Sequence, residues 1–110
     1  MSITHIVLFQ FKLNAEEASI RDACNRMAAL KDTCLHPSSK KPYIKSASGG
    51  KDNSPEGAQE GITHAFVVHF ENAADRDYYV KIDPVHQEFV RSLDGLVERA
   101  QVIDFTDGIF

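Results

Sequence analysis

The sequence predicts an α+β fold in which two βαβ halves build one antiparallel, ferredoxin-like sheet (βαββαβ) with helices on a single face. The main observation is a repeat. The run ITHIVLFQF at residues 3–11 returns half a chain later as ITHAFVVHF at residues 62–70. Both runs are rich in β-branched and aromatic residues, as strands are, and a helical pattern follows each of them. Strand, helix and strand, repeated once, is the order of a ferredoxin-like subunit.

In the first half, the strand at 3–11 leads to a helix predicted at about 15–33. Asn14 is suited to cap this helix, and Glu17 lies three residues on, where it can bond back to the cap. Apolar residues recur along the helix at the spacing of one face: Ile20, Ala23, Cys24, Met27, Leu30 and Cys34. Residues 42–48 then predict a strand, and the Gly-rich residues 49–57 predict a mobile loop.

In the second half, the pattern predicts a strand at 61–71 and a short helix that begins at Asn72. Asp83 and Pro84 open another helix, because Asp is a good N-cap and Pro fits the first turn. Its expected buried stripe consists of Phe89, Val90, Leu93, Leu96 and Val97. The last strand is predicted at 99–106.

Length and composition limit the function classes. A chain of 110 residues indicates a single domain over residues 1–110, and the net charge of −4 disfavours nucleic acid and anionic membranes as partners. No signal peptide and no membrane-spanning stretch is expected from the pattern. Cys24 and Cys34 lie roughly 15 Å apart along one predicted helix, too far for a disulfide. Reduced thiols favour a cytoplasmic location.

The predicted sheet has two apolar faces. In the first strand, His5, Val7 and Phe9 point to one side, while Ile6 and Leu8 point to the other. A single helix layer covers only one face, so the second face needs another cover. The sequence therefore predicts a homodimer in which two such sheets meet.

The chain resembles the stress-responsive dimeric α/β-barrel family over nearly its whole length. Five segments carry the resemblance: Thr4–Phe9, Gly61–Phe66, Phe70–Glu71, Asp83–His86 and Val102–Phe105. The resemblance implies a ferredoxin-like subunit that forms a barrel with its mate and holds a small apolar pocket between sheet and helices. One member that the chain resembles is the plant polyketide cyclase that makes olivetolic acid.

The resemblance also implies a set of site residues. By it, His86 matches the acid/base histidine, and either Tyr79 or Tyr78, seven and eight residues earlier, matches the active-site tyrosine. His5 and His64 match pocket histidines. The expected pocket is lined by side chains of the two repeated strands and of the last helix: His5, Val7, Phe9, His64, Phe66 and Phe89.

The spacing of His86 supports a chemical role. It lies in the first turn of its predicted helix, with Val90 and Leu93 following on nearly the same side, so its ring is expected to face the interior. A histidine there can move a proton near neutral pH, and the helix N-terminus disfavours its cationic form, as suits a base. The alternative is a structural histidine bonded to a backbone carbonyl. For Tyr78 and Tyr79, which leave the helix about 100° apart, the alternative is packing with the hydroxyl at the rim.

Three further expectations concern the remaining polar residues. His5 and His64 share a register in the two half-repeats and are expected to lie near each other, but no third ligand stands at metal-binding spacing, so no metal or other cofactor is expected. Asp104 lies on the same side of its strand as Val102, where it either pairs with a histidine or caps a turn.

These residues leave three functions open. The first is an enzyme that closes a poly-β-keto chain or decarboxylates a related compound, with His86 as acid/base and Tyr78 or Tyr79 as hydrogen-bond partner. The second is a non-enzymatic stress-response or ligand-binding dimer that holds small apolar molecules. The third and least favoured is a haem or quinol monooxygenase on the same dimeric fold.

Overall fold

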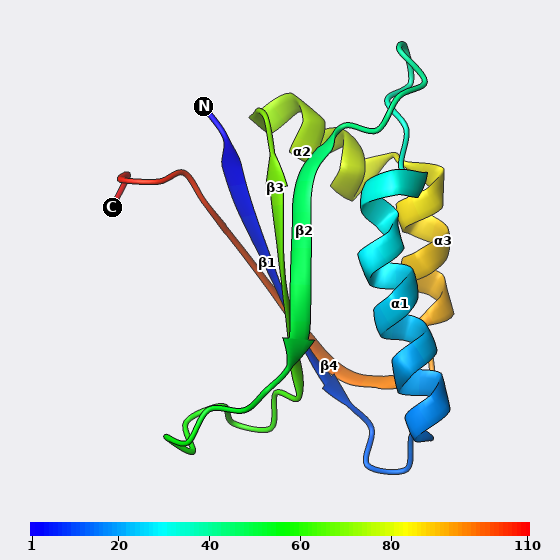
Figure 1. The fold of residues 1–110 in the computed structure, drawn as a ribbon, viewed down its shortest axis with the longest axis vertical. Helices are drawn as coiled ribbons and strands as arrows, with labels where there is room; N and C mark the ends of the chain where they lie inside the picture. The colour runs from blue at the N-terminus through cyan, green and yellow to red at the C-terminus, as the bar shows by residue number, and fades with distance from the viewer.

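The fold is a single antiparallel sheet covered on one side by helices. The computed structural model describes all residues, Met1–Phe110. The elements in order are β1 (Ile3–Phe11), α1 (Glu17–Thr33), β2 (Ile44–Lys51), β3 (His64–Phe70), α2 (Ala73–Lys81), α3 (Pro84–Ser92) and β4 (Val97–Phe105). The strands lie in the order β2-β3-β1-β4, and all three helices lie on the same side of the sheet (Figure 1). This arrangement confirms the predicted ferredoxin-like fold. None of the helices combines the length and apolar character that crossing a membrane requires.

The core lies between the sheet and α1 and α3. Alternate residues of β1, from Ile3 to Phe11, are buried because every second side chain of a strand points to the helix side. β3 contributes Phe66, Val68 and Phe70 to the same layer, and α1 contributes Ala23, Met27 and Leu30. The half-repeat therefore supplies the two central strands, β1 and β3, with their matching buried faces in register.

The opposite face of the sheet has no cover. Its apolar side chains include Ile6 and Leu8 from β1 and Val67 from β3, together with Ile103 and Phe105 from β4. Ile103 is 61% exposed and Phe105 is 44% exposed, although both lie in regular strand structure. The two-faced pattern of the sequence is therefore present in the structure, and an apolar surface of this kind is rarely left in water.

The predicted start of the first helix is wrong. The helix begins at Glu17, with Glu16 as its N-cap and no side-chain cap bond, not at residue 15 behind Asn14. The reason is a turn: the Ala15 amide donates to the Lys12 carbonyl at 3.0 Å, so residues 12–15 complete the turn out of β1 before the helix starts. By contrast, Asp83 caps α3 with its side chain, as predicted. Asn72, where the short helix was predicted to begin, is the N-cap of α2, which starts at Ala73.

The predicted limits of three strands and of the last helix are also corrected. β2 spans Ile44–Lys51 rather than 42–48, so its end enters the segment predicted as a mobile loop. It continues because Gly49 and Gly50 pair with Phe66 and Ala65 of β3. β3 begins at His64 rather than at 61, since Ile62 lies in a turn bonded to the Gln59 carbonyl. α3 ends at Ser92, so the predicted stripe residues Leu96 and Val97 lie outside it, and β4 begins at Val97 rather than at 99. The stripe residue Val90 is 47% exposed.

Candidate functional site

The candidate site is a cavity of about 490 Å³ on the helix side of the sheet. Its floor is formed by β1 and β4, and its walls by α1, α2 and α3. Nine of the fifteen lining residues are apolar. The lining consists of His5, Val7, Phe9, Met27, Arg76, Asp77, Val80, Lys81, His86, Phe89, Val90, Leu93, Ala100, Val102 and Asp104. A mostly apolar pocket with a few converging polar groups is the usual form of a small-molecule site.

His86 is held in one tautomer at the wall of this cavity. Its Nδ1–H donates to the carbonyl oxygen of Tyr79 at 2.8 Å, and its ring stacks on the Tyr79 ring with centroids 3.8 Å apart. Because a carbonyl oxygen only accepts, Nδ1 carries the proton and Nε2 of the neutral ring is a free acceptor. Burial is the largest effect on the pKa of His86 and lowers it; the bond to the Tyr79 carbonyl raises it in part, the nearby His5 lowers it, and Asp83 raises it by the least. His86 is therefore an unprotonated base near neutral pH.

The two candidate tyrosines do not line the cavity. Tyr79 is 1% exposed and lies behind His86, where burial raises the pKa of its phenol and the neighbouring Cys34 and Asp83 add to this effect. Tyr78 packs edge-on against Tyr43, with ring centroids 5.7 Å apart. Tyr79 thus contacts His86 through its carbonyl and its ring face, while neither hydroxyl is brought to the pocket.

A second histidine faces the same cavity, with a chain of charged groups behind it. His5 Nδ1 donates to Asp104 Oδ1 at 2.6 Å, and Asp104 Oδ2 accepts from Arg76 at 2.8 Å. Arg76 also pairs with Asp77 at 2.8 Å. His5 is buried, so its ring is fixed in direction and its Nε2 is the nitrogen left for a bound molecule. Of the two roles left open for Asp104, the structure has the pairing with a histidine.

His64 and Phe66 lie at another cavity, which corrects the expectation that His5 and His64 are neighbours. In the β1–β3 ladder, His5 lies opposite Val68, whereas His64 lies opposite Phe9 at the far end. His64 and Phe66 line a cavity of about 700 Å³ beside the N-terminal half of α1. Phe9 and Phe66 are in aromatic contact, with centroids 5.7 Å apart. Since Phe9 lines the first cavity and Phe66 the second, this pair of rings stands between them.

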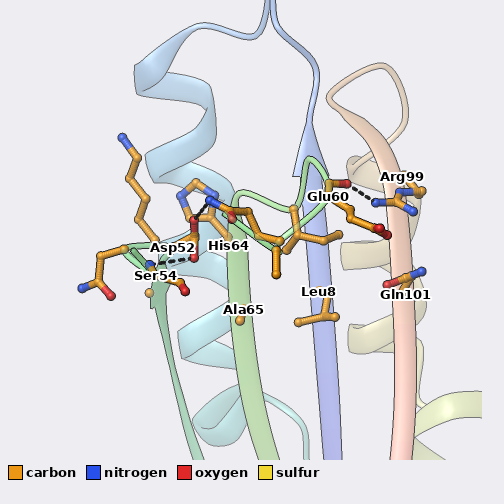
Figure 2. A pocket seen from close by; sticks show the side chains of 14 residues that line it. Leu8, Asp52, Ser54, Glu60, His64, Ala65, Arg99 and Gln101 are labelled. Atoms are coloured by element: carbon orange, nitrogen blue, oxygen red, sulfur yellow. Dashed lines mark hydrogen bonds between the residues drawn. The ribbon is translucent and has the colours of Figure 1, made fainter. Parts of the chain in front are cut away.

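A further hollow lies on the uncovered face of the sheet, at the end where the 52–63 segment projects (Figure 2). Leu8 and Ala65 form part of its floor, and the segment is braced from within. Asp52 accepts from the Ser54 amide and the Gln59 side chain, at 3.1 and 2.7 Å. Because this hollow opens on the face that lacks a cover, it belongs to that surface and lies apart from the cavity that holds the two histidines of β1 and α3.

Arg76 is the site residue that the sequence did not reveal. It lies 28 positions before Asp104 and meets it only in the folded chain, where Arg76 of α2 donates to Asp104 of β4. A signal for Asp104 itself was present, because a charged residue interrupts the apolar run Val102–Phe105 on the side that faces the helices. Of the predicted site residues, the structure brings together five at one cavity: His5, Val7, Phe9, His86 and Phe89.

Comparison with known proteins places this geometry in a family. The model of the stress responsive A/B barrel domain matches residues 3–107. The stress-response A/B barrel domain-containing protein At5g22580 of Arabidopsis thaliana is 28% identical over 104 residues, which are 92% of this chain and 82% of that protein. The crystal structure of At3g17210 from Arabidopsis thaliana is 27% identical, with a TM-score of 0.82 over 98% of this chain and 97% of that one.

Two more distant structures share the fold. The hydroxynitrile lyase of Passiflora edulis has a TM-score of 0.83 at 22% identity, over 99% of this chain and 96% of that one. A dimeric protein of ferredoxin-like fold from Bacteroides fragilis has a TM-score of 0.65 at 21% identity, over 94% of both chains. The match over nearly the whole sequence, on a sheet of the expected order, shows that the chain belongs to the stress responsive A/B barrel domain family.

Proposed function

We propose that this protein is an acid–base catalyst that makes or breaks a carbon–carbon bond next to an oxygen-bearing carbon in a small, mostly apolar compound. The observation that carries the proposal is the tautomer of His86. Its Nδ1–H is engaged by the Tyr79 carbonyl, so the free Nε2 is the base in an apolar cavity that also holds His5.

The chemistry follows from these two rings. In a ring closure of aldol type, His86 takes a proton from the carbon beside a carbonyl, the electron pair forms the new carbon–carbon bond, and the attacked carbonyl oxygen gains the charge. His5 Nδ1–H donates to Asp104, so Nε2 donates a hydrogen bond to that oxygen when the ring carries both protons, with the Asp104 carboxylate as its counter-ion. This gives His5 the hydrogen-bonding role that the sequence suggested for Tyr79 or Tyr78. Such a closure is the reaction that the sequence resemblance to a plant polyketide cyclase implies.

The reverse direction uses the same groups. If His86 removes the proton of a hydroxyl, the oxygen forms a carbonyl, the adjacent carbon–carbon bond breaks, and the leaving carbon takes the electron pair and then a proton. Cleavage of a hydroxynitrile is a reaction of this kind, and the neighbour from Passiflora edulis bears that activity in its name. Decarboxylation is a related cleavage in which carbon dioxide leaves instead.

We also propose that the working unit is a homodimer of this one domain. The uncovered apolar face of β1, β3 and β4 supports this, since a second sheet would remove it from water. The neighbour from Bacteroides fragilis is described as dimeric. Both cysteines are free thiols, which supports a reducing compartment such as the cytoplasm.

The test measures the rate at which the purified dimer converts each of two probe compounds, an aromatic cyanohydrin and a linear poly-β-keto thioester. His86→Gln keeps a side chain of similar size but removes the base, so turnover should fall roughly 100-fold or more. His36→Gln is the matched control, because His36 lies outside the cavity and its ring nitrogen accepts only from the Ser38 and Ser39 amides of its own turn. Full turnover by His86→Gln would exclude this mechanism.

The second candidate is a non-enzymatic dimer that binds small apolar molecules. It is favoured by the absence of a tyrosine hydroxyl from a cavity whose lining is mostly apolar. In this case, wild-type protein leaves both probe classes unchanged. It binds an apolar fluorescent probe with an affinity that His86→Gln does not alter.

A further inference from the structure

Asp83 is a buried carboxylate that no step of the proposed reaction uses. It is 1% exposed and belongs to none of the ion pairs of the chain, which is rare for an acidic side chain. As an N-cap it accepts from the amides of Val85 at 2.9 Å and His86 at 3.4 Å. A neutral Ser or Asn would cap the helix equally well, so capping alone does not account for a buried charge here.

A tyrosine from another element completes the environment of Asp83. The Tyr43 hydroxyl donates to its second oxygen, Oδ2, at 2.5 Å, and burial together with Asp83 raises the pKa of that phenol. Tyr43 comes directly before β2, so the bond ties the start of this strand to the first turn of α3. His86 lies in that turn, three residues after Asp83. The pair therefore fixes the part of the backbone that carries His86.

We propose that Asp83, held by Tyr43, is a positioning residue for His86: it anchors the first turn of α3, and its negative charge stabilises the imidazolium that forms when His86 takes a proton. The role in turnover rests on the proposed function, whereas the effect on the His86 ring does not. Without this charge, a base buried in an apolar cavity would bind a proton only weakly. Asp83 thus offsets part of the effect of burial, which lowers the pKa of His86.

Other charged or titratable groups also face His86, and each is a competing source of such an effect. From β1 and β4 come His5 and Asp104, and α2 contributes Tyr79, Arg76, Asp77 and Lys81. Cys34, at the end of α1, bonds the His86 backbone and has a pKa raised to about 12 by burial and by Asp83, so it stays neutral. The Asp104 carboxylate is already paired with His5 and Arg76, whereas that of Asp83 has no cation.

The experiment is a pH titration of the His86 ring by NMR, on dimer without substrate and with labelled histidine; loss of one signal in His86→Gln assigns the resonance. Asp83→Asn keeps the cap acceptor and the side-chain size, and should lower the pKa of His86. Tyr43→Phe keeps the charge, so the pKa of His86 should not fall. Asp77→Asn, which removes a half-exposed carboxylate at the same cavity, is the matched control and should have the smaller effect.

The outcomes separate the alternatives. An unchanged His86 pKa in Asp83→Asn, with only a lower Tm, would reduce Asp83 to a helix cap and overturn the proposal. Equal falls in Asp83→Asn and Tyr43→Phe would indicate displacement of the ring rather than loss of charge, and equal falls in Asp83→Asn and Asp77→Asn would indicate a general field; both overturn it. If the protein turns over a probe, Asp83→Asn should also slow it roughly three- to tenfold and move the acid limb of its pH profile down. Absence of turnover would count against the proposed function and leave the titration result standing.

Discussion

The close approach of β2 to the Phe66 ring makes a sharp prediction about Gly49. An ideal Cβ on Gly49 would lie 2.2 Å from Phe66 Cδ1 and 2.7 Å from the Ala65 carbonyl oxygen, distances that real Cβ atoms do not adopt. Phe66 is buried and its ring contacts Phe9, so it has little room to move away. Gly49→Ala should therefore overpack the core.

The size of the effect follows from the cost of overpacking. An extra methyl group in a packed core costs about 1–3 kcal/mol, and a domain of this size loses roughly 4 °C or more of Tm per kcal/mol. Gly49→Ala should thus lower the Tm by roughly 5–15 °C. Gly50→Ala is the matched control, since a Cβ on Gly50 meets nothing within 4 Å in the same strand. Its free energy of unfolding should change by about 0.5 kcal/mol or less.

The assay is thermal unfolding of both variants by circular dichroism at one protein concentration, because the Tm of a dimer depends on concentration. Equal Tm values for the two variants would refute the reasoning. Such a result would mean that Phe66 does not pack on β2, and the division between the two cavities that depends on its ring would then be wrong as well.

Two further predictions concern assembly and pH. Ile103→Asp places a charge on the uncovered sheet face and should shift the protein from dimer to monomer in size-exclusion chromatography with light scattering, whereas Leu13→Asp, at a side chain 106% exposed beyond β1, should leave the dimer intact; a dimeric Ile103→Asp would place the interface elsewhere. Burial lowers the pKa of both His64 and His86, so the unfolded chain, whose histidines titrate near about 6.5, binds more protons than the folded one. The free energy of unfolding should therefore be constant above about pH 7 and decrease as the pH falls below about 6.5, and urea unfolding of wild type and His64→Gln between about pH 5 and 7.5 should show a weaker dependence in the variant.

The fold was predictable because the sequence contains two similar halves. β1 and β3 carry nearly the same residues and occupy the two central positions of the sheet, so one pattern specifies both buried faces. Asp83 followed by Pro84 identified the start of α3, since this pair acts through local bonds alone. The start of α1 was missed because the turn from Lys12 to Ala15, also local, uses only backbone groups and leaves no mark in the side chains.

Site residues were predictable from the sequence only where the local backbone geometry determines the direction of the side chain. His5 and His86 reach the cavity because strand alternation and the first helical turn determine which way they point. Tyr79 was placed there too, but its ring fills the core behind His86, and only the packing of α2 on α3 decides between these positions. The pairing of Arg76 with Asp104 depends on how α2 lies relative to β4, since each residue alone resembles a solvated charge.

The different partners of His5 and His86 argue for different roles in the proposed reaction. His86 donates to a neutral carbonyl, which fixes its ring without strongly favouring the charged form, and burial keeps Nε2 unprotonated. His5 donates to the carboxylate of Asp104, which in turn is held by Arg76, so a charge on its ring has a partner. A pair of histidines in which one ring is tied to a dipole and the other to an anion can hold a base and a hydrogen-bond donor side by side. Asp104→Asn replaces the anion beside His5 with a neutral amide, so it should weaken His5 as a hydrogen-bond donor and leave His86 in place as the base.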